Sequence, residues 1–176
     1  MHSALAEPST TTPERHVVLL GAMGVGKTTI GRALAEALRC CFLDSDVRLT
    51  ELTGEDGRSI AAAKGVATLH ELEARILHDA LRESPPAVIA AAASVVDSDS
   101  AVAALMGHRC VWLRASDAVV TQRRDAGSHR RSTTIAERRQ LVRREPTYSM
   151  LSGLHIDTGA TDVAGAVAEI AEWLGR

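Results

Sequence analysis

The chain has 176 residues, the size of one ordinary domain with a complete hydrophobic core. Hydrophobic residues make up 45% of the chain but aromatic residues only 2%, so we predict a core built mainly from Ala, Leu, Val and Ile. The formal net charge of −2 argues against an extended nucleic-acid surface, although arginine is locally dense between residues 114 and 144. No apolar run approaches membrane-spanning length, which argues against a membrane partner.

The chain opens with a polar segment, residues 1–15, that contains Pro and Thr and lacks the apolar centre of a signal peptide. We predict a disordered N-terminal tail over this segment and a single domain over residues 16–176. The three cysteines, Cys40, Cys41 and Cys110, do not have metal-ligand spacing. We therefore expect reduced thiols in a cytoplasmic protein, and we expect that protein to be a monomer.

Short apolar runs alternate with longer helical patterns along the rest of the chain. We predict strands over residues 16–20, 41–43, 87–91, 109–113 and 154–156. We predict helices over residues 27–38, 46–52, 59–64, 68–82, 98–106, 116–124, 135–144 and 162–174. This alternation predicts a parallel sheet with helices on both faces.

The first predicted strand leads into a complete phosphate-loop motif, G-x-x-x-x-G-K-[ST], over residues 21–28. Glycines let the backbone curl so that successive N–H groups point at phosphate oxygens, and the following helix N-terminus adds partial positive charge. We predict that Lys27 reaches the β- and γ-phosphates and that the Thr28 hydroxyl binds Mg²⁺, so ATP and Mg²⁺ are the expected cofactors. The predicted nucleotide-binding residues of the loop are Gly21, Met23, Gly24, Val25, Gly26, Lys27, Thr28 and Thr29.

Two acids, Asp44 and Asp46, follow the second predicted strand. Ligands bind at the carboxyl edge of open α/β sheets, and on an extended segment these two side chains would point the same way. One acid could contribute to the Mg²⁺ shell while the other accepts a proton or hydrogen bond from an attacking hydroxyl. The alternative is that Asp44, Ser45 or Asp46 caps the helix that follows.

Residues 125–133 are polar, contain glycine and arginine, and have no helical or strand periodicity. In a phosphate-loop protein, an arginine-bearing segment of this kind is often a mobile lid that closes over the nucleotide. A plain connecting loop is the alternative interpretation.

Three motifs together resemble the shikimate kinase family: the phosphate loop, Asp44-Ser-Asp46, and Arg144-Glu-Pro-Thr-Tyr148. Segments 54–60 and 65–73 are similar to the family's G-x-S-I and G-E-x-x-F-R-x-x-E patterns, and the resemblance extends from about residue 16 to the C-terminus. It implies a P-loop kinase-like three-layer α/β/α sandwich with a five-stranded parallel sheet and a mobile lid. It also implies transfer of the γ-phosphoryl group of ATP to a ring hydroxyl.

The resemblance implies roles for the residues that match the family's motifs. Lys27, Asp46 and Arg130 are then the predicted catalytic residues. Asp46 resembles the acid that hydrogen-bonds the acceptor hydroxyls, and Arg130 the lid arginine that approaches the transferred phosphoryl group. Asp44 resembles the metal-associated acid, so it joins Thr28 as a predicted metal ligand.

Two further arginines match the family's binding residues. Arg123 falls at the adenine-stacking arginine, and Arg144 at the arginine that pairs with the substrate carboxylate. Arg123 could instead decorate a helix surface, and Arg131 and Arg143 compete with Arg130 and Arg144 for the family's positions.

The chain departs from the family pattern at the acceptor site. Ala91, Ala92 and Ala93 replace three consecutive glycines, and Leu69-His70 replaces Phe-Arg. Any of these alanines that needs a positive φ would be strained by about 1–2 kcal/mol, and a histidine lacks the bidentate fork of arginine. We therefore predict a smaller, more apolar and less cationic acceptor pocket. Alternatively, the alanines face the core and the pocket is displaced, and His70 is structural.

The sequence thus predicts an ATP-dependent kinase that phosphorylates a hydroxyl of a small polyhydroxylated molecule, with an acceptor that can differ from shikimate. The predicted acceptor-binding residues are Asp46, His70, Ala91, Ala92, Ala93 and Arg144. A catalytically idle ATP-binding protein with a regulatory role is the alternative, although Lys27 and Asp46 argue against it. A nucleotide or nucleoside kinase is a third possibility, but the few aromatic residues are not obviously placed to stack a base.

Overall fold

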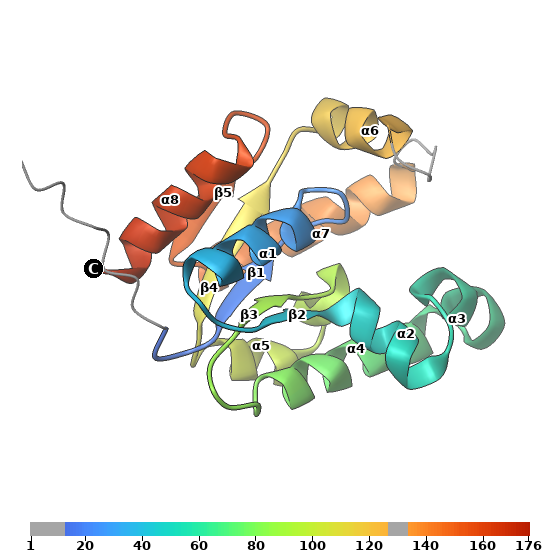
Figure 1. Ribbon diagram of the computed structural model, residues 1–176. Helices are drawn as coiled ribbons and strands as arrows, with labels where there is room; N and C mark the ends of the chain where they lie inside the picture. The colour runs from blue at the N-terminus through green and yellow to red at the C-terminus, as the bar shows by residue number, and fades with distance from the viewer. Residues whose placement is uncertain (1–12, 127–133) are drawn as a thin grey trace, which may run out of the picture.

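The fold is a three-layer α/β/α sandwich around one five-stranded sheet (Figure 1). The computed structural model describes residues 13–126 and 134–176. All neighbouring strands pair in parallel, in the order β2-β3-β1-β4-β5. The strands are β1 (Val17–Leu20), β2 (Phe42–Asp44), β3 (Val88–Ala90), β4 (Arg109–Arg114) and β5 (Leu154–Asp157). The predicted fold class is confirmed.

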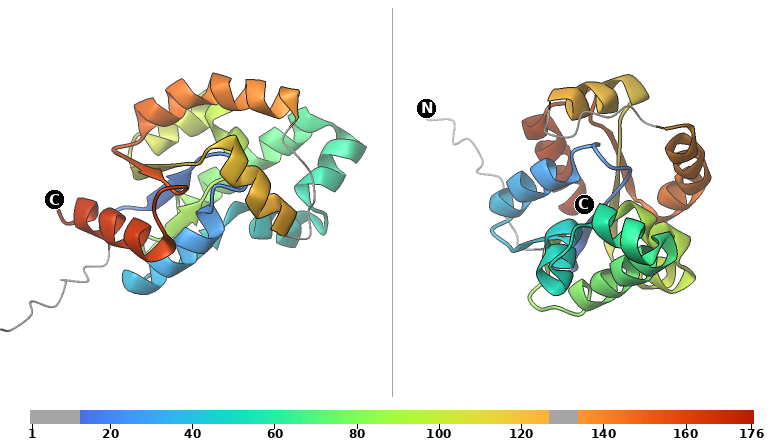
Figure 2. Two further views of the ribbon diagram at one scale, coloured as in Figure 1. Left: turned by 90° about the horizontal axis from the view of Figure 1, so that it is seen from above. Right: turned by 90° about the vertical axis from the view of Figure 1, so that its right-hand side faces the viewer.

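Strand β1 lies at the centre of the sheet and is buried on both faces. Because successive side chains of a strand point to opposite faces, Val17 and Leu19 contact one core while Val18 and Leu20 contact the other. The first core is covered by α1 (Lys27–Ala37) and α8 (Val163–Leu174), and the second by α4 (Val66–Ala80), α5 (Asp99–Leu105) and α7 (Ile135–Leu151). Figure 2 shows α7 and the α1–α8 pair on opposite sides of the strands.

The remaining helices lie towards the carboxyl edge of the sheet or extend the α4 layer. Helices α2 (Ser45–Thr53) and α3 (Gly57–Lys64) pack with α4 through the small cluster of Leu49, Ile60 and Ile76. Helix α6 (Asp117–Ala126) leads to residues 127–133, so most of the predicted lid and all of Arg130 lie outside the described residues. The predicted tail lies outside them too, except for residues 13–15. Within the described ranges, no helix has both the length and the apolar character for a membrane crossing.

Two elements differ from the sequence prediction. Helix α7 continues to Leu151 instead of ending at Arg144, although Pro146 lies inside it. Proline normally disrupts a helix interior, but Tyr148 in the next turn is fully buried and donates a hydrogen bond of 2.7 Å to the carbonyl of Ala93. This anchor holds the last turns of α7 against the core. It also anchors a short 3₁₀ helix that was not predicted, η1 (Ala93–Asp97).

The turn from β1 into the phosphate loop depends on Gly21. Its φ of +136° is a conformation that residues with a side chain rarely adopt, and a Cβ there would fall inside contact distance of the Leu113 carbonyl oxygen. The loop is therefore drawn tightly against the end of β4.

Replacing Gly21 by Ala should destabilise the protein more than replacing Gly54 by Ala. Gly54 also has a positive φ, +72°, but no atom lies within 4 Å of an added Cβ. We expect Gly54→Ala to cost about 1–2 kcal/mol from backbone strain alone, and Gly21→Ala to cost about 1–3 kcal/mol more from overpacking. Urea unfolding measures both free energies, and equal losses would contradict this account of the turn.

Candidate active site

A cavity of about 530 Å³ opens beside the phosphate loop at the carboxyl edge of the sheet. Strands β1, β2 and β3 end there, so residues distant in sequence meet at one place. The predicted site residues that line this cavity are Met23, Gly24, Gly26, Lys27, Thr28, Thr29, Asp44, Asp46, His70, Ala91, Ala92, Ala93, Arg123 and Arg144. Gly21 and Val25 are not among them. Their carbonyl groups accept hydrogen bonds that hold the loop from behind.

Lys27 is held inside the curve of the loop. Its Nζ donates hydrogen bonds to the carbonyl oxygens of Gly21 at 2.8 Å and Ala22 at 3.0 Å. Loss of solvation lowers the pKa of Lys27 to about 8, a shift that the nearby carboxylates of Asp46 and Asp44 partly offset. The amine is therefore a poorly solvated cation at neutral pH, well suited to an anionic ligand.

Thr28 and Asp44 form a direct pair beside Lys27. The Thr28 hydroxyl donates a hydrogen bond of 2.7 Å to Oδ2 of Asp44, while Oδ1 accepts a bond of 3.0 Å from the backbone N–H of Asp46 and so caps α2. The predicted extended segment with two parallel acids is wrong, because Asp46 already lies in the first turn of α2. Asp44 thus combines the capping role with a position next to Thr28.

This pair fits a magnesium ion bound mainly by water and phosphate. Mg²⁺ commonly takes one or two protein oxygens and completes its octahedron with substrate phosphates and water. Over residues 13–126 and 134–176 no group of three or more His, Cys, Asp or Glu residues could hold a metal alone. A hydroxyl and a carboxylate, as in Thr28 and Asp44, are the oxygen ligands that such an ion needs.

Two carboxyl groups in the cavity have raised pKa values. Loss of solvation raises the pKa of Asp46, Asp44 raises it further, and Lys27 opposes the shift. Burial also raises the pKa of Glu73, although the hydrogen bond that it accepts from Ser94 lowers it. Asp46 is therefore a better proton acceptor than an ordinary aspartate. Glu73 is the last residue of the family-like segment 65–73, and its position in the cavity was not predicted.

Arg123 of α6 lines the cavity and contacts the phosphate loop at Val25. Its Nη1 donates hydrogen bonds to the Val25 carbonyl at 3.3 Å and to the Thr158 hydroxyl at 3.0 Å. Thr158, which follows β5, is buried and itself donates to the Val25 carbonyl at 2.8 Å. Arg123 thus has specific contacts rather than a free position on a helix surface. The part of Thr158 was not predicted, because residues at the end of β5 carried no recognisable motif.

The three alanines after β3 are unstrained. Ala92 has φ −61° and ψ 149°, and Arg39 is the one non-glycine residue with a positive φ in the part of the chain that the structure describes. The predicted strain is therefore absent. Ala91 and Ala92 are buried in the core beneath α4 and α7, and together with Ala93 they also line the cavity. Both parts of the sequence interpretation, core-facing and cavity-lining, thus hold for Ala91 and Ala92.

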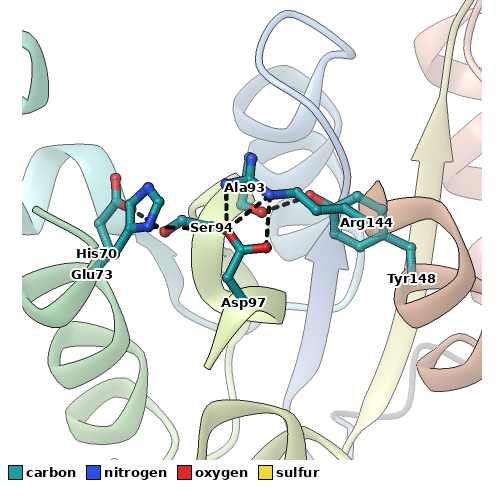
Figure 3. A network of polar contacts seen from close by, with 7 residues as sticks. All are labelled: His70, Glu73, Ala93, Ser94, Asp97, Arg144 and Tyr148. Carbon is teal, nitrogen blue, oxygen red and sulfur yellow. Dashed lines mark hydrogen bonds and ion pairs between the residues drawn. The ribbon is translucent and has the colours of Figure 1, made fainter. Parts of the chain in front are cut away.

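A polar network closes the far wall of the cavity, between α4 and α7 (Figure 3). Arg144 makes a bidentate contact with Asp97, with Nε at 3.1 Å from both carboxylate oxygens and Nη2 at 2.6 Å from Oδ2. His70 lies on the other side, with Nδ1 at 3.9 Å from the same Oδ2. Burial and the charge of Arg144 lower the pKa of His70 despite Asp97, so the imidazole is predominantly neutral at pH 7. Asp97 was not predicted.

The comparisons with known proteins agree with this geometry. The family model described as shikimate kinase matches residues 23–175. The chain belongs to the shikimate kinase family. A shikimate kinase of Corynebacterium efficiens is 32% identical over 160 residues, which are 88% of this chain and 93% of the relative.

Solved structures extend the similarity. The shikimate kinase of Acinetobacter baumannii in complex with shikimate has a TM-score of 0.79 and 25% identity, with 94% of each chain covered. A gluconokinase of Sinorhizobium meliloti shares the fold, with a TM-score of 0.58, 21% identity and coverage of 94% of this chain and 97% of that one. Shikimate kinases use ATP with Mg²⁺, so the predicted cofactors are confirmed.

Mg-ATP binding should weaken as the pH rises above about 8. The empty protein loses the Lys27 proton near that pH, and the phosphates favour the protonated amine. We expect the association constant to be level from pH 7 to 7.5 and to fall by up to about tenfold per pH unit above pH 8. Calorimetric titration at several pH values measures it. The Lys27→Arg variant keeps its charge over this pH range, so any binding that it retains should not depend on pH. A wild-type association constant that stays level up to pH 9.5 would contradict the role of the protonated Lys27 amine.

Proposed function

We propose that this small-molecule kinase transfers the γ-phosphoryl group of Mg-ATP to a hydroxyl of a small polyhydroxylated molecule, in an acceptor pocket that differs from that of shikimate-phosphorylating relatives. The observation that carries the proposal is the meeting of Lys27, the Thr28–Asp44 pair and Asp46 at one cavity. Phosphoryl transfer requires mainly positioning and charge stabilisation, and these residues supply both.

At the nucleotide end, the chain provides a cradle for phosphates. The loop N–H groups and the N-terminus of α1 would hold the phosphates, and the Lys27 amine, now bonded to two loop carbonyls, would supply positive charge to them. Thr28 and Asp44 would hold Mg²⁺ directly or through water, and the ion, when bound, neutralises charge on the β- and γ-oxygens. Arg123, held by its contacts with Val25 and Thr158, would contribute to nucleotide binding.

At the acceptor end, Asp46 orients the attacking hydroxyl and takes its proton late in the transfer. Its raised pKa suits this task, because a more basic carboxylate takes up the proton of the hydroxyl more readily. Arg130 remains the predicted lid arginine, which would exclude water and stabilise charge on the transferred group.

The altered acceptor pocket is supported by its wall. Methyl groups of Ala91, Ala92 and Ala93 occupy the positions where the family has glycines, and a neutral His70 stands where the family has an arginine. The wall therefore has less space and one cation fewer than the family pattern. The same general fold occurs in a protein described as a gluconokinase, so the fold accommodates more than one acceptor.

ADP release in a coupled assay tests the proposal, with shikimate and then a panel of cyclitols, sugars and sugar acids as acceptors. We expect turnover with at least one polyhydroxylated acceptor and its loss, to below about 1% of wild type, in Lys27→Ala. Lys64→Ala, which removes an exposed lysine paired with Glu55, is the matched control and should retain activity. Binding of Mg-ATP without turnover on any acceptor would instead support the idle ATP-binding alternative.

Replacing Asp46 by Asn should lower kcat by about 10²–10⁴-fold, because the amide cannot take the proton of the hydroxyl. The wild-type activity should fall as the pH decreases through the raised pKa of Asp46, and the variant should lack this acid limb. Steady-state kinetics between pH 4.5 and 8 measure both effects. Glu51→Gln, an exposed acid on the same helix, is the control. An unchanged kcat in Asp46→Asn would exclude the assigned role.

A further inference from the structure

Asp97 occupies the carboxylate-binding edge of Arg144. The Arg144 side chain is only 12% exposed, and its Nε and Nη2 both bind the Asp97 carboxylate, the geometry with which an arginine recognises the carboxylate of a ligand. Figure 3 shows Asp97 between His70 of α4 and Arg144 of α7. Arg144 lines the cavity, whereas Asp97, at the end of η1, lines a neighbouring pocket together with His70 and Ser94.

The pair is built into the fold on both sides. Element η1 is fixed by the hydrogen bond from Tyr148 to the Ala93 carbonyl and by the bond from buried Ser94 to Glu73. Tyr148 lies one turn after Arg144 on α7, so the same helix supplies the arginine and the anchor of the segment that carries its partner. Burial alone would lower the pKa of Arg144, but the hydrogen bond and charge of Asp97 raise it overall.

Of the other basic side chains that line the cavity in the described part of the chain, Lys27 and Arg123 contact the phosphate loop, and only His70 lies beside the Arg144–Asp97 pair. His70 is predominantly neutral at pH 7, and the two acids that face the same end of the cavity, Asp46 and Glu73, oppose negative charge on a ligand. A carboxylate entering this end would have to displace Asp97 from Arg144 and then lie near carboxyl groups. A neutral polyol meets hydrogen-bond donors and acceptors without this penalty.

We propose that Asp97 determines acceptor specificity, by supplying from within the protein the carboxylate that Arg144 would otherwise take from the substrate. The acceptor is then an uncharged polyhydroxylated compound rather than a sugar acid or another carboxylate. This inference rests on the proposed function and names the chemical class of its acceptor. Asp97 touches no reacting atom, so it is a specificity-determining residue and not a catalytic one.

A pair of acceptors that differ only in this charge tests the inference. Shikimate carries a carboxylate, and its methyl ester has the same ring and hydroxyls without the negative charge. We expect wild-type kcat/KM to be at least about tenfold higher for the ester, the effect of one unfavourable charged contact. Equal values, or a preference for shikimate, would overturn the inference.

Variants assign the preference to the pair. Asp97→Ala should raise the ratio of kcat/KM for shikimate over the ester at least about tenfold, and Asp97→Asn should shift it in the same direction. Adding Arg144→Ala to Asp97→Ala should remove the gain, while adding His70→Arg should increase it by providing a second fork. Asp99→Asn, which removes an exposed charge two residues along the chain, should leave the ratio unchanged. An unchanged ratio in the Asp97 variants would contradict the assignment, as would a rise in the ratio that persists in the double variant without Arg144.

A binding measurement separates this inference from the proposed function. Shikimate is titrated calorimetrically into wild type and Asp97→Ala, each saturated with Mg-ADP, with thermal melts to confirm folding. Binding that appears or tightens at least about tenfold in Asp97→Ala supports the inference even if no acceptor is turned over, in which case only the proposed function fails. Equal shikimate binding by both proteins overturns the inference even if the enzyme is active.

Discussion

The poorly solvated amine of Lys27 is the constraint around which the site is organised. The loop can hold it because Gly21 turns sharply beneath the end of β4, which leaves the carbonyls of Gly21 and Ala22 facing inwards. The acids nearby, above all Asp46 and Asp44, partly compensate the loss of water around this cation. Phosphate is a better partner than backbone carbonyls for such a charge, so the empty site already favours an anionic ligand.

The acceptor end differs, since two side chains of its far wall, Arg144 and Ser94, already have partners within the protein. Arg144 is paired with the Asp97 carboxylate, and the Ser94 hydroxyl donates a hydrogen bond to Glu73. Neither pair needs a charged ligand as a further partner. Under the proposed function, the two ends of one cavity would be specialised: one for a highly charged nucleotide and the other for hydroxyl groups. The family's phosphate-loop motif is retained, and we propose that the surface that selects the acceptor has changed.

The sequence predicted those features that depend on local chemistry. The phosphate loop, the acids after β2 and the alternation of strands and helices each depend on a short stretch of sequence. Apart from the longer α7, the structure places the predicted elements within a few residues of their predicted limits. The features that were missed depend on contacts between distant segments. Arg144 and Asp97 are 47 positions apart, and Tyr148 and Ala93, whose contact keeps α7 helical past Pro146, are 55 apart. No local pattern marks either pair.

The most direct test of the account is a crystal structure with Mg²⁺, ADP and tetrafluoroaluminate, an analogue of the phosphoryl group in transfer. The account predicts that the Lys27 amine leaves the carbonyls of Gly21 and Ala22 and binds the analogue within the loop, with Asp46 facing its open side. An analogue bound away from residues 21–28, or a Lys27 amine still bonded to the two carbonyls beside it, would contradict the account.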